Sequence, residues 1–426
     1  MTTEVTGALA PTRAVLSSGV TVLAKETRTI PAVTISAALQ AGSIYDPDET
    51  LGLAHFLSRV IDRGTERRTA DAIAEAFDLR GVSLGVTATR HALTLTCTCL
   101  SEDFEAVLAL LADIVCHPTC LEKEILTGRG GILTTIRQDD DNPGVKAMQG
   151  VMALLYGQTH PYGRPAKGTP ETVERIDRQT LLDFHRARAA PTALSVVIVG
   201  DVSPTAAVEA ASRAIGDWQV ELLGGPTLET PGRQPPRRRA VIPMMSKAQV
   251  DISYGFTTIA RADPEYDAYW LMSNILGQYG MGGRLGQSIR ERQGMAYYAF
   301  CLFEANVIAG PLIVRVGVSA ANVDRAVASI DEEVSKIATD GVTDTELADS
   351  KRYLIGSIPR NLETNIGIAS FLQMVQQFDL GLDYEQRLPG LLGEVTREKV
   401  NAVARHTLSP DHAAVVIAGP YEEHAG

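Results

Sequence analysis

The sequence predicts an α+β protein of two homologous domains, each a mainly antiparallel sheet with helices packed on one face. The first observation behind this prediction is an internal repeat. Near the start of each half, residues recur 217 positions later: Val33, Ile35, Ser36, Asp46 and Pro47 as Val250, Ile252, Ser253, Asp263 and Pro264. The run at 196–200 recurs at 415–419, which is 219 positions later. Agreement at both ends indicates a duplicated structural unit.

The second observation is the hydrophobic pattern within a half. Residues 93–100 alternate between apolar and polar side chains, which predicts a strand with one buried face. The i, i+3, i+4, i+7, i+8 spacing of a helix with one apolar side occurs at Leu53, Phe56, Leu57, Val60 and Ile61. Similar spacing predicts helices over 104–115 and 205–215. Strands followed by helices in each half are typical of a sheet covered by helices.

The length of 426 residues exceeds what one ordinary hydrophobic core supports, so two or more domains are expected. The stretch 222–239 is rich in Gly and Pro, which is typical of a linker. We therefore expect a first domain over 12–220, a linker over 221–239 and a second domain over 240–426.

The composition narrows the class of protein. Hydrophobic residues make up 45% and charged residues 21% of the chain, as in globular proteins. A formal net charge of -12 gives no support for nucleic-acid binding, which needs a basic face. No apolar run is long enough to predict a membrane span, and the first residues lack the pattern of a secretory signal. The sequence therefore predicts a cytoplasmic protein.

The five cysteines are odd in number and lack the spacing of a disulfide framework. Cys97 and Cys99 lie two positions apart in the predicted strand, so both side chains face the same side. The run 116–120 holds two Cys and one His, but its Pro indicates a loop and no second pair of ligands follows. We expect reduced thiols that pack in the core.

The segment 52–59, Gly-Leu-Ala-His-Phe-Leu-Ser-Arg, resembles the zinc helix of the pitrilysin, insulinase and mitochondrial processing peptidase family. The family pattern there is H-x-x-E-H, in which two His bind zinc and the Glu polarises the attacking water. His55 matches the first His. Ser58 stands in place of the Glu, and Arg59 stands in place of the second His.

The third ligand of that family is a Glu on a later helix, and Thr135 occupies its position here, 76 residues after Arg59. Catalytic zinc needs three N, O or S ligands and an open position for water. Arg59 stays protonated, and Ser58 has no base nearby to make it a proton acceptor. We expect no metal at this degenerate site, and we expect His55 to act as an ordinary helix residue. Arg59 would replace the charge of the lost metal and hold neighbouring acidic groups.

The second half contains Gly280-Met281-Gly282-Gly283-Arg284-Leu285, followed by Arg290-Glu291 and Gly294-Met295-Ala296-Tyr297. This stretch resembles the family's segment that carries an Arg and a Tyr seven residues apart. The resemblance implies that Arg290 and Tyr297 hydrogen-bond the substrate backbone and the developing oxyanion at the zinc of a partner subunit. The alternative is that Arg290 belongs to a surface charge cluster and that Tyr297 is only a strand aromatic. The glycines do not fit a nucleotide-binding motif.

The run 81–89 corresponds to the edge strand that lines the cleft in active relatives, with Gly85 where Asn is expected. An edge strand can still take up an extended peptide through its backbone. The change at Gly85 nevertheless argues against catalysis in this half.

Together, these residues predict a non-catalytic, zinc-free subunit of a heterodimeric zinc metallopeptidase. The chain would be inert alone, enclose a peptide chamber with a homologous zinc-binding partner, and present Arg290 and Tyr297 to that partner's zinc. The substrate would be an unfolded peptide. The alternative is a structural or peptide-binding scaffold with no role in proteolysis. An independent zinc-free hydrolase ranks last, because the sequence assembles no Ser-His-Asp or Cys-His constellation.

Overall fold

The computed structural model describes residues 2–4, 9–230, 235–278 and 283–422. The chain divides into two compact units. Unit 1 contains residues 1–136, 165–226 and 358–387, and unit 2 contains residues 137–164, 227–357 and 388–426. Each unit therefore takes one segment from the other half of the chain, which differs from the domain ranges expected along the sequence.

Unit 1 is built on a sheet of seven strands in the order β1-β2-β3-β7-β4-β6-β5. Only the β3–β7 pair is parallel. The predicted strand over 93–100 is confirmed as β6. The strands are β1 (Thr2–Glu4), β2 (Thr12–Val15), β3 (Thr21–Glu26), β4 (Ala32–Leu39), β5 (Gly85–Ala88), β6 (Leu93–Leu100) and β7 (Leu194–Gly200).

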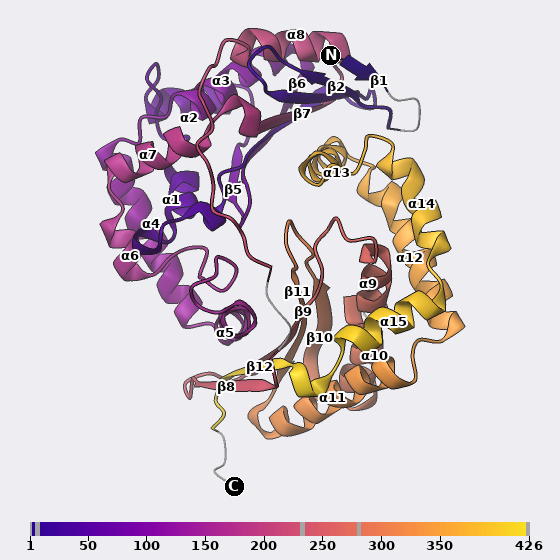
Figure 1. The fold of residues 1–426 in the computed structure, drawn as a ribbon. Coiled ribbons are helices and arrows are strands. Elements are labelled where there is room, and N and C mark those ends of the chain that lie inside the picture. The colour runs from indigo at the N-terminus through magenta and orange to yellow at the C-terminus, as the bar shows by residue number, and fades with distance from the viewer. Residues whose placement is uncertain (1, 5–8, 231–234, 279–282, 423–426) are drawn as a thin grey trace. The chain divides into compact units, whose positions relative to one another are not determined.

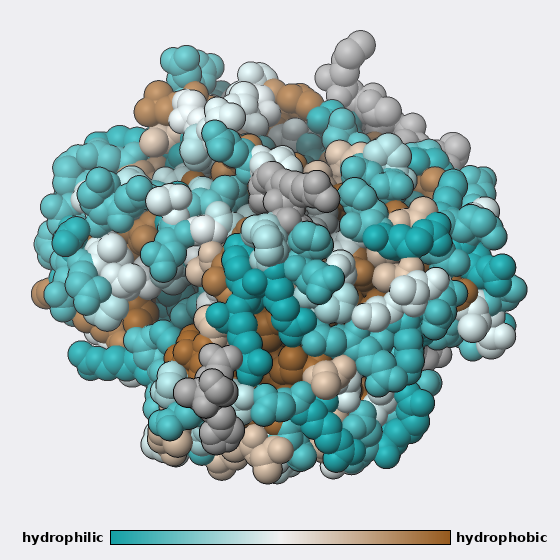
Figure 2. Space-filling model, turned by 60° about the horizontal axis from the view of Figure 1, so that its bottom comes forward, coloured by the Kyte–Doolittle hydropathy of each residue, from teal (hydrophilic) through white to brown (hydrophobic). Residues whose placement is uncertain are grey.

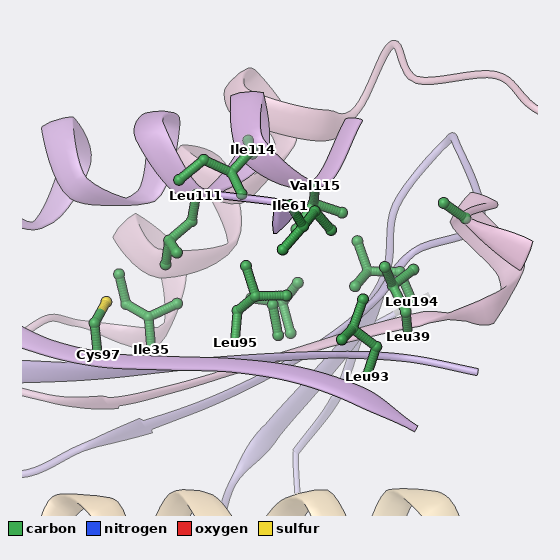
Figure 3. Packing of buried hydrophobic residues seen from close by; sticks show 14 of the residues in the cluster. Ile35, Leu39, Ile61, Leu93, Leu95, Cys97, Leu111, Ile114, Val115 and Leu194 are labelled. Atoms are coloured by element: carbon green, nitrogen blue, oxygen red, sulfur yellow. The ribbon is translucent and has the colours of Figure 1, made fainter. Parts of the chain in front are cut away.

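One face of this sheet is covered by α1 (Leu53–Val60), α3 (Phe104–Cys116) and α8 (Pro204–Ile215), close to the helices that the sequence predicts. Alternate residues of the strands face these helices and are buried. Figure 3 shows Ile35, Leu93 and Leu95 of the sheet pointing toward Leu111 and Ile114 of α3. Every second side chain of the strands thus packs against the apolar sides of the helices in one core.

The opposite face of the same sheet is covered in part by α13 (Asn365–Gln377). Leu23, Val197 and Val199 alternate with the residues that face α3, and they pack against Ile368 and Leu372 of α13. The sequence did not predict this helix from the second half of the chain, because an apolar helix side does not specify which sheet it covers.

Unit 2 is built on a sheet of five strands in the order β10-β11-β9-β12-β8. Only the β8–β12 pair is parallel. The order matches β5-β6-β4-β7-β3 of unit 1, which confirms the duplicated α+β fold (Figure 1). The strands are β8 (Arg238–Pro243), β9 (Val250–Thr257), β10 (Ala296–Phe303), β11 (Pro311–Val318) and β12 (Ala414–Gly419).

The two faces of this second sheet are covered by helices from different parts of the chain. Tyr254 of β9 donates a hydrogen bond from its hydroxyl to Asp331 of α11 (Val323–Thr339), at 2.8 Å. The next residue, Gly255, faces Val151 of α5 (Pro143–Tyr156), a helix from the first half of the chain.

Other helices complete the two units. They are α2 (Ala70–Asp78), α4 (Glu122–Asp140), α6 (Pro170–Arg175), α7 (Arg178–Arg188), α9 (Tyr266–Ser273), α10 (Gly283–Leu285), α12 (Asp344–Asn361), α14 (Tyr384–Glu394) and α15 (Arg397–Thr407). Two short segments are π-helical: η5 (Asn274–Gln278) and η6 (Gly286–Arg292). Turns of 3-10 helix are η1 (Ser43–Tyr45), η2 (Asp48–Thr50), η3 (Ser101–Asp103), η4 (Pro191–Ala193), η7 (Ala320–Asn322) and η8 (Pro410–His412).

The surface in Figure 2 is mainly hydrophilic, with hydrophobic residues scattered between charged and polar ones. Across the part of the chain that the structure describes, helices of membrane-spanning length and hydrophobicity do not occur.

Candidate functional site

Helix α1 carries three of the expected site residues in unit 1. Its N-terminus is fixed by Asp46, whose carboxylate accepts hydrogen bonds from the N–H groups of Gly52 and Ala54, each at 2.9 Å. Gly52 adopts a φ of 93°, and a Cβ there would collide with the carbonyl of Lys167. Glycine is therefore required where the chain turns into the helix.

His55, Ser58 and Arg59 are held differently within α1. Ser58 is buried at 4% exposure, and its hydroxyl donates to the carbonyl of His55 at 2.6 Å. Arg59 is exposed, and His55 is half-buried. The Ser58 hydroxyl is thus bonded within its own helix.

Thr135 lies on α4, which packs against α1 at Gly128. A Cβ at Gly128 would lie 3.0 Å from Val60 and 3.4 Å from Phe56, so glycine allows the helices to approach closely. Thr135 lies two turns further along α4, about 10 Å away. Its hydroxyl donates to the carbonyl of Gly131 at 3.0 Å, so it is bonded within its own helix.

The residues at these positions do not fit a zinc ion. Two hydroxyls bonded to backbone carbonyls, one imidazole and one guanidinium offer a single good ligand and one positive charge. Within residues 2–4, 9–230, 235–278 and 283–422, we find no group of three His, Cys, Asp or Glu side chains placed to hold a metal ion. No chemical step is therefore assigned to this site.

The charge of Arg59 acts on the acidic group one turn further on. Burial raises the pKa of Asp62 above its ordinary value, while the positive charges of Arg63 and Arg59 lower it and the negative charge of Glu124 raises it. Arg63 Nε lies 3.4 Å from the Asp62 carboxylate. Arg59 therefore favours the ionised form of the partly buried Asp62 carboxylate.

Strand β5 is an edge of the unit 1 sheet and lies beside α1. Val86 and Ala88 pack toward the core, whereas Gly85 and Thr87 are exposed on the other face. A Cβ at Gly85 would meet only the Thr96 carbonyl, at an ordinary 3.6 Å. Packing therefore does not require glycine here, and β5 is the last described strand on this side of the sheet.

Arg290 lies in unit 2 on one continuous helical segment, α10 followed by η6. Leu285 and Ile289 of this segment are buried, and Arg290 is exposed. The N–H of Gly294, which has a φ of 64°, donates to the carbonyl of Arg290 at 3.0 Å. This turn leads the chain directly into β10, which carries Tyr297.

Tyr297 occupies a β-bulge in the edge strand β10. Ala296 lies opposite Val318 and Tyr298 lies opposite Gly317, so Tyr297 is the extra residue. Its side chain is 72% exposed. Bulges commonly redirect a side chain next to a functional site.

The neighbouring Tyr298 turns inward and donates its hydroxyl to Asp251 of β9. Asp251 is 7% exposed, and burial raises its pKa, although the hydrogen bond from Gln249 and the charge of Arg315 oppose the rise. Sequence reasoning missed this pair. The signal was a charged residue within the apolar strand 250–257.

The alternative of a surface charge cluster around Arg290 stays a prediction. The neighbouring Arg292 contacts Glu333 of α11 at 3.4 Å. The glycine-rich stretch at 280–282 lies outside the described residues, so the loop before Arg290 is known from Gly283 onward.

Comparison with known proteins identifies the family. A model described as "Insulinase (Peptidase family M16)" matches residues 21–167, and a model described as "Peptidase M16 inactive domain" matches residues 175–354. The chain belongs to the M16 peptidase family. The resemblance to pitrilysin and insulinase is confirmed, and the residues that the two models match lie in both halves of the chain.

Relatives extend over nearly the whole length of this M16 chain. An uncharacterized zinc protease of Mycobacterium tuberculosis is 28% identical, over 97% of this chain and 94% of its own. The uncharacterized zinc protease YmxG of Bacillus subtilis is 24% identical, over 94% and 96%. A solved M16 inactive domain peptidase from Pseudomonas fluorescens superposes with a TM-score of 0.90 at 26% identity, over 97% and 98%. A protease from Helicobacter pylori shares the fold, with a TM-score of 0.88 at 17% identity, over 96% and 99%.

Proposed function

We propose that this M16 chain is the non-catalytic, zinc-free subunit of a two-subunit zinc metallopeptidase. Its partner would be a homologous subunit with an intact H-x-x-E-H motif. One observation carries the proposal: the chain has replaced the base and two ligands by Ser58, Arg59 and Thr135, yet it exposes Arg290 and Tyr297 on one short segment. Tyr297 is 72% exposed at a bulge, and bulges commonly redirect a side chain next to a functional site.

The chemistry of these two side chains suits peptide hydrolysis at the partner's zinc. A guanidinium and a phenol are fixed donors, so both can hydrogen-bond a peptide carbonyl oxygen that becomes negatively charged. Arginine stays protonated in proteins, so Arg290 needs no proton exchange during the reaction. Loss of one such donor typically lowers the rate by about 10²–10³.

The proposed substrate is an unfolded peptide within a chamber that the two subunits enclose. The edge strand β5 supports this, because its outer N–H and C=O groups can add an extended peptide as a further strand. Recognition through backbone groups makes little demand on sequence, so we expect broad peptide binding.

The test measures zinc content and hydrolysis of an unstructured fluorogenic peptide, with the chain alone and with a co-expressed homologue that carries H-x-x-E-H. We expect neither zinc nor turnover from the chain alone, and turnover on pairing. Arg290→Ala should then lower turnover about 10²–10³-fold while the complex stays assembled. The control is Arg352→Ala, because Arg352 is 78% exposed and pairs with Asp349 on its own helix. Stoichiometric zinc in the lone chain, or full turnover with Arg290→Ala, would contradict the proposal.

The second candidate is a peptide-binding scaffold with no role in proteolysis. The open edge of β5 favours it equally, since strand addition needs no catalytic group. Peptide binding by the chain, without hydrolysis in any pairing, would support the scaffold and exclude the split active site.

A further inference from the structure

The helical segment 283–292 that carries Arg290 is fastened at its start by Arg284. The Arg284 guanidinium donates from Nε to Glu346 Oε1 at 2.7 Å, and from Nη2 to Glu346 Oε2 at 2.9 Å and to the Gly341 carbonyl at 2.8 Å. The side chain of Arg284 is only 16% exposed. Such a two-pronged pair fixes orientation as well as distance.

The acceptor of this pair is itself held at the N-terminus of α12. Glu346 Oε2 accepts from the N–H and hydroxyl of Thr343, at 2.8 and 3.0 Å, while the Glu346 N–H donates to Thr343 Oγ1 at 3.2 Å. This reciprocal arrangement is a capping box. Gly341 is followed by Val342, whose N–H donates to Asn401 of α15 at 2.8 Å. Arg284 is thus bonded to the start of α12, which is held by its own capping box and by a hydrogen bond to α15.

The far end of the segment is tied less firmly. Arg292 contacts Glu333 of α11 at 3.4 Å and is 67% exposed. Gln293 donates to Ser329 at 3.0 Å and accepts from Arg325 at 2.9 Å. The Arg292–Glu333 contact is single and long, whereas Arg284 makes two short bonds to Glu346, so the stronger attachment is at Arg284.

Side-chain packing against α12 does not hold the segment 283–292 in the way that the Arg284–Glu346 pair does. A cavity of about 110 Å³ lies there, lined by Arg284, Glu346, Asn274 and Ser350 among others. Asn274 is 1% exposed, and its Nδ2 finds no hydrogen-bond partner among the described residues. A polar hollow leaves the segment room to shift, whereas Leu285 and Ile289 hold only its buried side.

We propose that Arg284 is a positioning residue that sets the placement of Arg290 and Tyr297. It touches no substrate and acts through the segment between its own anchor and the bulge in β10. The Gly294 N–H bond to the Arg290 carbonyl transmits any shift of the helix to the start of that strand. The inference rests on the proposed function for its consequence in catalysis, while its structural claim concerns this chain alone.

The structural claim is tested on the full chain without a partner. 3-Fluorotyrosine is placed at position 297, and its ¹⁹F resonance is compared in the parent, in Arg284→Lys and in Arg352→Ala. Lysine keeps the charge and loses the planar fork. We expect a shifted or broadened line for Arg284→Lys, unchanged for Arg352→Ala, with similar thermal unfolding in all three. An unchanged line for Arg284→Lys would overturn the inference, whatever the peptidase activity.

The kinetic consequence is tested in the paired complex. Arg284→Lys should lower kcat about 10-fold with KM nearly constant, less than the loss expected for Arg290→Ala. In a background that carries both Arg290→Ala and Tyr297→Phe, Arg284→Lys should have no further effect on the residual rate, because it acts through these two residues. Glu346→Gln, which can retain the capping box, should resemble Arg284→Lys. Equal losses in both backgrounds would mean a general structural role and would overturn the inference. Unchanged turnover of the Arg290→Ala complex would contradict only the proposed function.

Discussion

His91 lies at the turn between β5 and β6 and is only 8% exposed. Burial, reinforced by the positive charge of Arg90, lowers the pKa of His91 from 6.5 to about 4. The folded state therefore favours the neutral imidazole. The unfolded chain binds the proton first as the pH falls, so this group destabilises the fold progressively between pH 6.5 and pH 4.

We expect the parent protein to lose about 2–3 kcal/mol of unfolding free energy through His91 between pH 7 and pH 4.5. His91→Gln should remove that part of the acid sensitivity. The measurement is urea unfolding at both pH values, and His406→Gln is the control, because His406 is exposed. Equal pH dependence of the parent and His91→Gln would show that the fold does not lower the pKa of His91.

The cysteines show a second effect of burial at the residue scale. Burial raises the pKa of Cys97 and Cys116 to about 12 and that of Cys99 and Cys120 to about 11, and it raises the pKa of the fully buried Cys301 as well. Because the thiolate is the reactive form, all five thiols should be inert in the folded chain. No disulfide joins them in the structure.

At neutral pH, we expect a maleimide reagent to leave most native chains unlabelled after about an hour. After unfolding in urea, all five thiols should be labelled. Mass spectrometry of the intact chain counts the labels. Rapid labelling of a single native cysteine would identify an opening of the fold at that site.

At the scale of elements, β10 combines an outward Tyr297 with an inward Tyr298. The sequence predicted the functional role of the first but not the bulge, because residues 296–303 are all apolar or aromatic and show no alternation that an extra residue could shift. The Tyr298 bond to the buried Asp251 is what fixes the inward side of the strand.

These adjacent tyrosines form a matched pair for measurement. Tyr298→Phe removes the hydroxyl from a buried carboxylate, so we expect a loss of about 1–3 kcal/mol in unfolding free energy. Tyr297→Phe removes an exposed hydroxyl and should change stability by less than about 0.5 kcal/mol. Urea unfolding of both variants at pH 7 decides the prediction, and similar effects from the two would argue against the Tyr298–Asp251 bond.

At the scale of the whole molecule, the repeat in the sequence predicted the duplicated fold, because residues 217 to 219 positions apart come to occupy equivalent strands. The apolar spacing predicted α1, the first helix of the degenerate zinc motif, and the family resemblance implied the second helix, α4. The repeat did not predict that α5 and α13 are exchanged between the units. The apolar side of α13 resembles that of any surface helix, and only the structure shows that Leu372 packs on Val197 and Val199 of β7.

This exchange has a consequence for the linker between the halves. Cutting the chain at 227–230, which has no regular secondary structure, separates two polypeptides that each hold a helix of the other's compact unit. Removing α13 would expose Leu23, Val197 and Val199, and burial of each such side chain is worth roughly 1.5–3 kcal/mol. We therefore expect a chain with a protease site inserted there to elute as one particle after cleavage.

The control is the same cleaved protein with Leu372→Asp, which places a charge against the apolar surface of β7. Size-exclusion chromatography should show one peak for the cleaved parent and separated or aggregated halves for the variant. If the cleaved parent already separates into two folded halves, the helices do not hold the units together, and each half folds with its own core. Retention of the pair would instead mean that the exchanged helices α5 and α13 keep the two cleaved halves associated.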